Sequence, residues 1–250
     1  MIHTAYDVMK EYLITGAELD GQFQISTLPK VDFSPGKSID FVSSKSRSLK
    51  GHKDLTVNFY IDDKSFLQVW NQPDQYVEHL KCFHSVCSPD FTIASGMPTA
   101  LNIYNLYRNH ALGFYFAILG VNIIPSVNVI SPKEMPWIFD GTPHRSTVSC
   151  CTNGRVRSKS ARLEFCENFK EMLDAIEPTK VVIVGIVPDE LNVDVPIINL
   201  NSRSQNMKEM FRKEGPWEQS VADQQNEGTK KPVGRRSAEA DFSVLWGEET

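Results

Sequence analysis

Short apolar segments recur along residues 1–201, and stretches with helical spacing separate most of them. From Val181 on, only Gly185 interrupts the valines and isoleucines of segment 180–187. Strands that are apolar on both faces belong to sheets covered on both faces, which is typical of parallel sheets. The segments expected to form strands are 55–61, 81–87, 121–130, 146–151, 180–187 and 196–200. The pattern predicts an α/β domain with a mostly parallel sheet.

The intervening segments predict the helices that cover this sheet. Segment 98–118 starts at Pro98, which suits the first turn of a helix, and it is apolar on nearly every face. We therefore expect a buried helix there. The other expected helices are 4–15, 65–70 and 161–176. Residues 16–51 are polar and serine-rich, which predicts an irregular stretch or a weak hairpin.

Two architectures fit this alternation of strands and helices. No expected strand is followed by a glycine-rich turn of the Rossmann or P-loop type. We therefore favour an irregular or incomplete βα-barrel-like sheet, and an open doubly wound sheet is the alternative.

The last part of the chain differs in composition. We expect residues 1–201 to form a single α/β domain and residues 202–250 to form a mostly disordered tail, because the tail has too few aliphatic residues to offset its ordering entropy. A short helix is expected at 205–213. The terminal segment Phe242–Trp246 is acidic and aromatic, so it is either a docking motif for a protein partner or an unstructured end.

Charge and cysteine content limit the class of protein. The formal net charge is −5, which argues against a protein that coats duplex DNA but leaves room for a local basic groove. The longest apolar region, 111–130, is interrupted by Gly, Asn, Pro and Ser, and no leader precedes it, so no membrane partner and a cytoplasmic location are expected. The five cysteines lack zinc spacing and are expected to be reduced; no metal ligand is predicted, and the cofactor stays unknown.

Polar residues follow several of the expected strands. Asp90, Asn128, Asn153 and Gly154 all stand at carboxyl ends, where α/β proteins gather their functional groups. Turn formation and helix capping explain any one of these residues equally well. We expect Asp90, Asn128 and Asn153 to converge on one rim of the sheet.

Several blocks of sequence resemble one known family. The blocks are 88–92, 104–110, 120–127, 137–143, 152–154, the helix from 161, and 181–185. In this order they are similar to the domain-of-unknown-function family 4417 of bacteria, phages and plasmids, over about residues 50–190. The resemblance implies no established reaction. Two positions depart from the family's pattern: Val184 precedes Gly185 where a tyrosine is usual, and Asn128–Val129 follow the proline-containing strand where an aromatic residue is usual.

Three residues are candidates for catalysis. Asp90 follows the stiff Ser88–Pro89 dipeptide and suits a general acid or base, although an N-cap or Asx turn would also explain it. Asp140 and His144 share a loop with two turn formers, and an unperturbed histidine suits proton transfer. A solvated loop histidine is the alternative interpretation.

The expected substrate-binding residues are Arg108, Asn109, Asn128, Asn153 and Gly154. Arg108 lies within an apolar helix, so its guanidinium needs an anionic partner. That partner is either Asp90 or Asp140, in a structural ion pair, or a bound phosphate or carboxylate.

Two functions remain open from the sequence. In the first, the protein acts on a nucleotide, nucleoside or nucleic acid by hydrolysis or by glycosyl or nucleotidyl transfer at the carboxylate-rich rim. In the second, it is a non-catalytic accessory protein of a mobile element, active in replication or against host defence, and its tail binds a protein or nucleic-acid partner. Whether the protein is an enzyme is left undecided.

Overall fold

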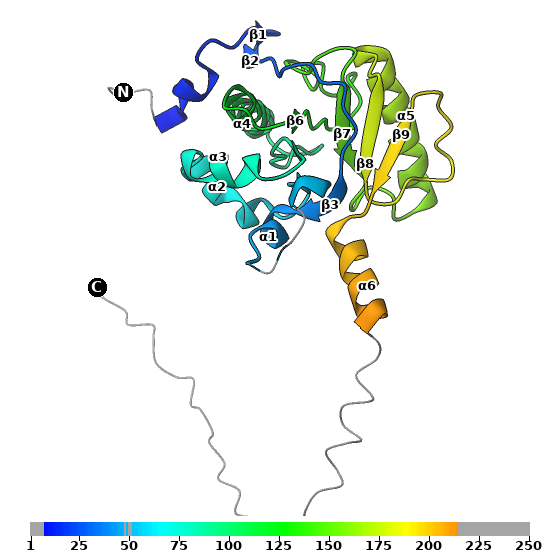
Figure 1. Cartoon of the computed structure of the whole chain (residues 1–250). Coiled ribbons are helices and arrows are strands. Elements are labelled where there is room, and N and C mark those ends of the chain that lie inside the picture. The colour runs from blue at the N-terminus through cyan, green and yellow to red at the C-terminus, as the bar shows by residue number, and fades with distance from the viewer. Residues whose placement is uncertain (1–7, 48, 50–51, 215–250) are drawn as a thin grey trace, which may run out of the picture. The chain divides into compact units, whose positions relative to one another are not determined.

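Parallel strands in chain order form the frame of the computed structural model, which describes residues 8–47, 49 and 52–214. One sheet orders β3 (Lys37–Asp40), β4 (Leu55–Asn58), β5 (Ser85–Cys87) and β6 (Ile123–Ile124). A second sheet orders β7 (Thr147–Cys151), β8 (Lys180–Val184) and β9 (Ile197–Leu200). A parallel bridge between Ser126 and Ser149 joins the two sheets, so the sequence of strands runs from β3 to β9 (Figure 1). The predicted α/β class with a mostly parallel sheet is confirmed.

The two sheets curve around a shared interior. Tyr60, Cys87 and Val184 form one buried cluster, and Cys151 and Leu200 pack against it. In a flat sheet, the five strand steps from β4 to β9 would separate Tyr60 from Leu200 by about 24 Å. The order contains no reversal, which a doubly wound sheet has at its switch point. This arrangement is compatible with the incomplete barrel favoured from the sequence, and no pairing of β3 with β9 closes it among the described residues.

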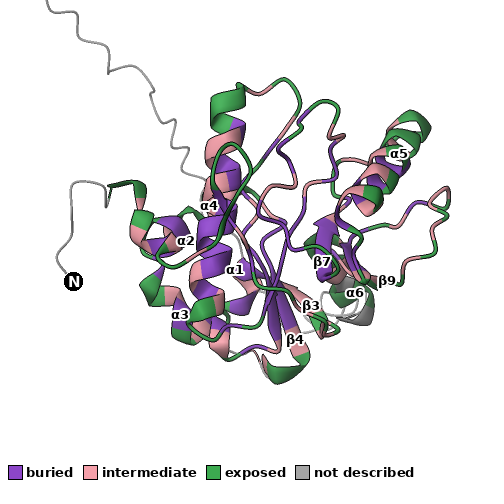
Figure 2. Ribbon diagram, turned by 90° about the horizontal axis from the view of Figure 1, so that it is seen from above, coloured by how far each residue is buried: buried purple, intermediate pink, exposed green. Residues whose placement is uncertain are grey.

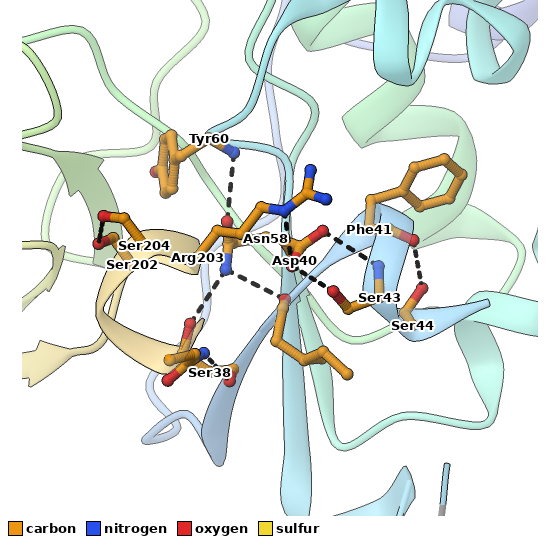
Figure 3. Close-up of polar contacts among 12 residues, drawn as sticks. Ser38, Asp40, Phe41, Ser43, Ser44, Asn58, Tyr60, Ser202, Arg203 and Ser204 are labelled. Carbon is orange, nitrogen blue, oxygen red and sulfur yellow. Dashed lines mark hydrogen bonds and ion pairs between the residues drawn. The ribbon is translucent and has the colours of Figure 1, made fainter. Parts of the chain in front are cut away.

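Side chains at the start of α6 (Arg203–Glu214) connect the last strand to the first. Asn206 Nδ2 donates to the backbone oxygen of Ser38 in β3 at 3.0 Å. Arg203 Nε lies 3.8 Å from the buried Asp40 carboxylate (Figure 3). Asp40 also caps α1 (Phe41–Ser44) by accepting from Ser43 N at 3.0 Å. The helix start thus spans the place where strand pairing is missing. Helix α6 as a whole includes the segment 205–213, for which a short helix was expected.

Each sheet has its own helical cover. Helices α2 (Leu67–Asn71), α3 (Asp74–Lys81) and α4 (Thr99–Ile118) lie together beside the first sheet, and α5 (Lys159–Ile176) lies against the second (Figure 1). Buried aliphatic and aromatic side chains of the helices and strands form one large core on each side. Buried residues are concentrated on the strands and on one face of α4, as Figure 2 shows.

Several element boundaries differ from the prediction, and three elements were missed, namely β3, α1 and α3. Helix α3 occupies residues where the strand 81–87 was expected to begin, so β5 starts only at Ser85. Of the expected helix 4–15, residues 1–7 lie outside the described residues, and Glu11–Ile14 form a single 3₁₀ turn, η2. Further 3₁₀ turns are η3 (His52–Asp54) and η4 (Asp63–Ser65).

The serine-rich stretch 16–51 contains more order than an irregular segment. The expected weak hairpin is present as β1 (Leu19–Asp20) and β2 (Ile25–Ser26), which pair antiparallel. The stretch also contains β3, a parallel edge strand whose polar residues gave no apolar signal.

Two further expectations concern membranes and thiols. Within the described residues, no helix is long and apolar enough to cross a membrane. All five cysteines are free thiols, and Cys87, Cys150 and Cys166 are buried. The reduced state expected from the sequence stays a prediction.

The shared interior makes a testable prediction about Tyr60. Its hydroxyl lies 2.9 Å from Ser149 Oγ in β7 and 3.1 Å from Ser126 Oγ, and these two serines form the bridge that joins the sheets. Tyr60→Phe leaves these buried hydroxyls with one partner fewer, so we expect the free energy of unfolding to fall by about 1–2 kcal/mol in urea denaturation.

The control for Tyr60 is Tyr76→Phe. Tyr76 packs edge-on against Phe41, and its hydroxyl makes no hydrogen bond within the described part of the chain. Its loss should change stability by less than about 0.5 kcal/mol. Equal stabilities of the two variants would contradict a hydrogen-bonded interior between the sheets.

Candidate functional site

A cleft of about 420 Å³ opens at the carboxyl ends of β4, β5, β6 and β7. Parallel α/β folds place their ligands at this end of the sheet, because the loops that follow the strands meet there. The polar and charged side chains that line the cleft are Tyr60, Asp62, Asp90, Thr92, Asn128, Asn153, Arg155 and Arg157. Four connections of the chain contribute to it.

Asp90 is the carboxylate at the centre of this set. It follows β5 by three residues, and Asn128 Nδ2 donates to its Oδ1 at 3.2 Å. Burial raises the pKa of Asp90 from the ordinary 3.8 to about 6, although the charge of Arg155 and the hydrogen bond from Asn128 favour the ionised form. A carboxyl group with a pKa near 6 is able both to donate and to accept a proton close to neutral pH.

The backbone before Asp90 is fixed by serine hydroxyls. Ser126 N donates to Ser88 Oγ at 2.8 Å, and Ser126 Oγ donates to the Ser88 carbonyl at 2.7 Å. Ser88 N donates to the Ile124 carbonyl at 2.9 Å. Pro89 restricts the next step of the chain. Asp90 therefore leaves the sheet from a rigid point.

The backbone after Asp90 is held by asparagines of α4. Asn109 accepts from Phe91 N at 2.6 Å and donates to the Phe91 carbonyl at 3.1 Å. Asn102 makes the same pair of bonds to Ala94, and Asn105 donates to the Thr92 carbonyl. These three residues, which we call the asparagine ladder, act on segment 91–94 as a neighbouring strand would. Together with the serine contacts they fix Asp90 from both sides.

The loop between β7 and α5 supplies the positive charge of the cleft. Segment 152–159 contains Arg155, Arg157 and Lys159 and no acidic residue. Gly154 turns the chain at a φ of +80°, which a side chain would strain. Arg155 Nη1 donates to the Val129 carbonyl at 2.9 Å, which holds the guanidinium at the cleft wall. Exposed Arg157 stands next to it without a hydrogen bond to the described residues.

The acidic residues after β4 have structural partners. Asp62 caps η4 by accepting from Lys64 N at 3.1 Å. The Lys64 ammonium, 3.1 Å from Asp62 Oδ2, lowers the pKa of Asp62, and the backbone N–H adds to this effect. Asp63 accepts from Thr92 N and from Thr92 Oγ1 at 2.9 Å. Within the described residues, no group of three or more His, Cys, Asp or Glu side chains is placed to hold a metal ion.

Four of the predicted site residues come together here. Asp90, Asn128, Asn153 and Gly154 all line the cleft, from three different loops. The geometric expectation that three of these residues meet at one rim is met, while their roles in binding or catalysis stay predictions. Cys151 also lines the cleft, whereas Cys150 faces the core, as expected for adjacent strand residues.

Asp140 and His144 lie elsewhere. The Asp140 carboxylate packs against Gly21 of the β1–β2 turn, where burial and the charge of Asp20 raise its pKa. His144 is exposed in a separate shallow hollow beside Pro143, before the start of β7. Neither residue lines the cleft, because their loop has already returned to the amino end of β7.

Arg108 and Asn109 support the site from outside. The Arg108 guanidinium stacks 3.7 Å from the centre of the Phe91 ring, also contacts Tyr104, and donates to Asn105. It pairs with neither Asp90 nor Asp140. Burial lowers the pKa of Arg108, and the nearby Tyr104 and Asp63 oppose this shift only in part. Both polar atoms of the Asn109 side chain are used by the Phe91 backbone. The structure therefore gives Asn109 a positioning role in place of the predicted substrate contact.

Sequence reasoning missed the two arginines and Tyr60. The signal for the arginines was present, since Arg155, Arg157 and Lys159 alternate with small residues immediately after Asn153–Gly154. Tyr60 had no such signal, because it falls within the expected apolar strand 55–61, whereas β4 ends at Asn58 and leaves Tyr60 at the rim.

Comparison with known proteins identifies relatives of the chain. A family model described as "Domain of unknown function (DUF4417)" matches residues 17–201. The "Gene 1 protein" of Mycobacterium phage L5 is 26% identical over 179 residues, which cover 72% of this chain and 78% of that protein. The "Gene 1 protein" of Mycobacterium phage D29 is 24% identical over 163 residues, which cover 65% of this chain and 60% of that protein. No solved structure matches the chain. The resemblance expected for residues 50–190 is confirmed and extends in both directions.

The raised pKa of Asp90 makes a prediction about stability. The protonated form of Asp90 is favoured in the folded state. Its contribution to the free energy of unfolding is therefore present below about pH 4 and is lost as the pH rises through about 6. Asp90→Asn removes this loss. Chemical denaturation should show little difference from wild type near pH 4 and a variant that is more stable by about 2 kcal/mol near pH 7.

The exposed Asp54→Asn variant is the control for a general effect of charge. An Asp90→Asn protein that is less stable than wild type at neutral pH would show that ionised Asp90 makes a net favourable structural contact. Asp90 would then be no candidate for proton transfer.

The asparagine ladder makes a second prediction. Asn109→Ala leaves a buried backbone N–H and carbonyl of Phe91 without partners, so the free energy of unfolding should fall by about 3 kcal/mol. Asn153→Ala, at an exposed position in the cleft, should change it by less than about 0.5 kcal/mol. Denaturation curves of the two variants that coincide would show that the ladder does not hold segment 91–94.

Proposed function

We propose that this chain, which belongs to the DUF4417 family, a phage-associated domain of unknown function, is an enzyme. From the side chains that line the cleft we infer that it acts on a phosphate-bearing substrate of the nucleotide class, by hydrolysis or group transfer. The observation that carries the proposal is a carboxyl group with a pKa of about 6, set beside two arginines at the carboxyl rim of a parallel sheet.

Arg155 and Arg157 suit the phosphate. A guanidinium presents its N–H groups in a planar fork that matches two phosphate oxygens. Arg155 is anchored to the Val129 carbonyl, and the Nη1 contact leaves its other N–H groups for a ligand. Arg157 has no competing partner in the described residues, so it is free to close on the phosphate from the solvent side.

Asp90 suits proton exchange at the bond that breaks. In hydrolysis, protonated Asp90 gives its proton to the leaving atom as the bond to that atom breaks. Water adds to the other fragment, and the proton released by water returns to Asp90. Rigid backbone on both sides keeps the carboxyl group in place during this exchange, which is the geometric requirement for acid–base catalysis.

This proposal replaces two of the expected catalytic residues. Asp140 and His144 do not line the cleft, so Asp90 acts without them. The alternative function, an accessory protein of a mobile element that binds a partner through its tail, depends on segments such as Phe242–Trp246 that lie outside the described residues. The cytoplasmic location expected from the sequence stays a prediction.

Binding and turnover should respond differently to two substitutions. Arg157→Gln should weaken binding of a nucleoside monophosphate about tenfold or more, because it removes a charged contact to phosphate. Asp90→Asn should leave binding within about threefold and abolish turnover, since it removes the exchangeable proton. Calorimetric titration measures the first effect, and chromatographic product analysis over a panel of nucleotides and nucleosides measures the second.

The matched control is Arg145→Gln, which removes an exposed arginine that pairs with Glu177 away from the cleft. Equal affinities of the Arg157→Gln and Arg145→Gln proteins would sink the phosphate assignment. An Asp90→Asn protein with full turnover would sink the catalytic one. If wild type binds no nucleotide and deletion of residues 215–250 removes binding of a protein or nucleic-acid partner, the accessory-protein alternative holds.

A further inference from the structure

A second cavity opens directly beside the cleft. Its volume is about 270 Å³, and it shares Val129, Gly154 and Arg155 with the cleft. Arg155 therefore stands between two hollows, and its guanidinium is within reach of a ligand in either. A single molecule that is longer than one nucleotide can occupy both.

The second cavity has the walls that a nucleobase requires. Its apolar surface comes from Ala94, Val129, Ile130, Ala161 and Phe165. Glu164 and Asn168 stand four residues apart on α5 and line the same cavity. Within the described residues neither side chain has a hydrogen bond or an ion pair, so a carboxylate acceptor and an amide remain for the edge of a base. Apolar walls take the flat faces of a base, while polar groups bind its edge.

We propose that the substrate contains two nucleoside units joined through one phosphate, a dinucleotide unit, with the phosphate at Arg155 and one unit in each cavity. This inference rests on the proposed function, because it assigns the phosphate to the same arginine. Asp90 lines only the larger cavity, so the bond that breaks belongs to the unit held there. The smaller cavity contributes affinity and selects for length.

The test compares affinities of the full chain for one unit and for two. Wild type is titrated by calorimetry with adenosine monophosphate, with the dinucleotide adenylyl-adenosine, and with the uridine counterparts of both. The dinucleotides should bind about tenfold more tightly than the mononucleotides or better, since the second unit adds contacts. A single strand of eight adenosines shows where the dinucleotide unit comes from. Tight binding of this strand indicates that the unit is the end of a strand, and weak binding indicates that it is a free dinucleotide.

Filling the smaller cavity should remove the tighter binding of dinucleotides relative to mononucleotides. Ala161→Leu adds bulk inside it, whereas Ser160→Leu adds the same bulk at the preceding exposed position of α5. The first variant should bind mononucleotides like wild type but lose the advantage of the dinucleotide, and the second should keep it. Asn168→Leu, which removes the amide, should lose part of it.

The outcomes separate this inference from the proposed function. If wild type binds mononucleotides and dinucleotides equally, or if Ala161→Leu weakens both alike, the two-unit substrate is wrong while the phosphate site stands. If wild type binds no nucleotide of either length, both the proposed function and the inference are wrong.

Discussion

Buried backbone groups need hydrogen-bond partners, and the short strands of this protein provide too few of them. Strand β5 has three residues and β6 has two, yet the chain that directly follows each of them is buried. Polar side chains complete the network where strand pairing stops. The asparagine ladder of α4 holds segment 91–94, and Asn199 donates to the carbonyls of Ile183 at 3.0 Å and Gly185 at 2.7 Å. The sheets keep their curvature because side chains serve as strand neighbours at their ends.

The same contacts determine the properties of the cleft. Asp90 lies between a serine-bonded segment and an asparagine-bonded one, so it has little freedom to move toward water. Its pKa is raised because the carboxyl group is held in a poorly solvated place, and its backbone is kept there by bonds that do not involve the carboxylate. Functional sites typically use stabilising contacts to hold an ionisable group where its charged form is unfavourable. The arginines of the β7–α5 loop reach the same cleft from another connection of the chain, and Arg155 is anchored there by the Val129 carbonyl.

The sequence was informative wherever a property depended on neighbouring residues. Strand and helix segments, the split of Cys150 and Cys151 between core and cleft, and the meeting of Asp90 with Asn128 follow from local patterns and from the geometry of parallel sheets. Asp140 could not be placed in this way, because its connection leaves the rim at β6 and returns to the far end of β7. The role of Asn109 could not be decided from the sequence, since a polar residue in an apolar helix signals a partner but does not say whether the partner is a ligand or the protein's own backbone.

The start of α6 has a consequence for how this domain is handled. Strands β3 and β9 each have one unpaired edge, and the contacts of Arg203 and Asn206 lie across the space between them. The family model ends at residue 201, just before these contacts. A chain cut there would present two strand edges to other molecules, and exposed edges are templates for intermolecular pairing and aggregation. The contacts beyond the matched domain therefore belong to the folded unit that a shortened chain should retain.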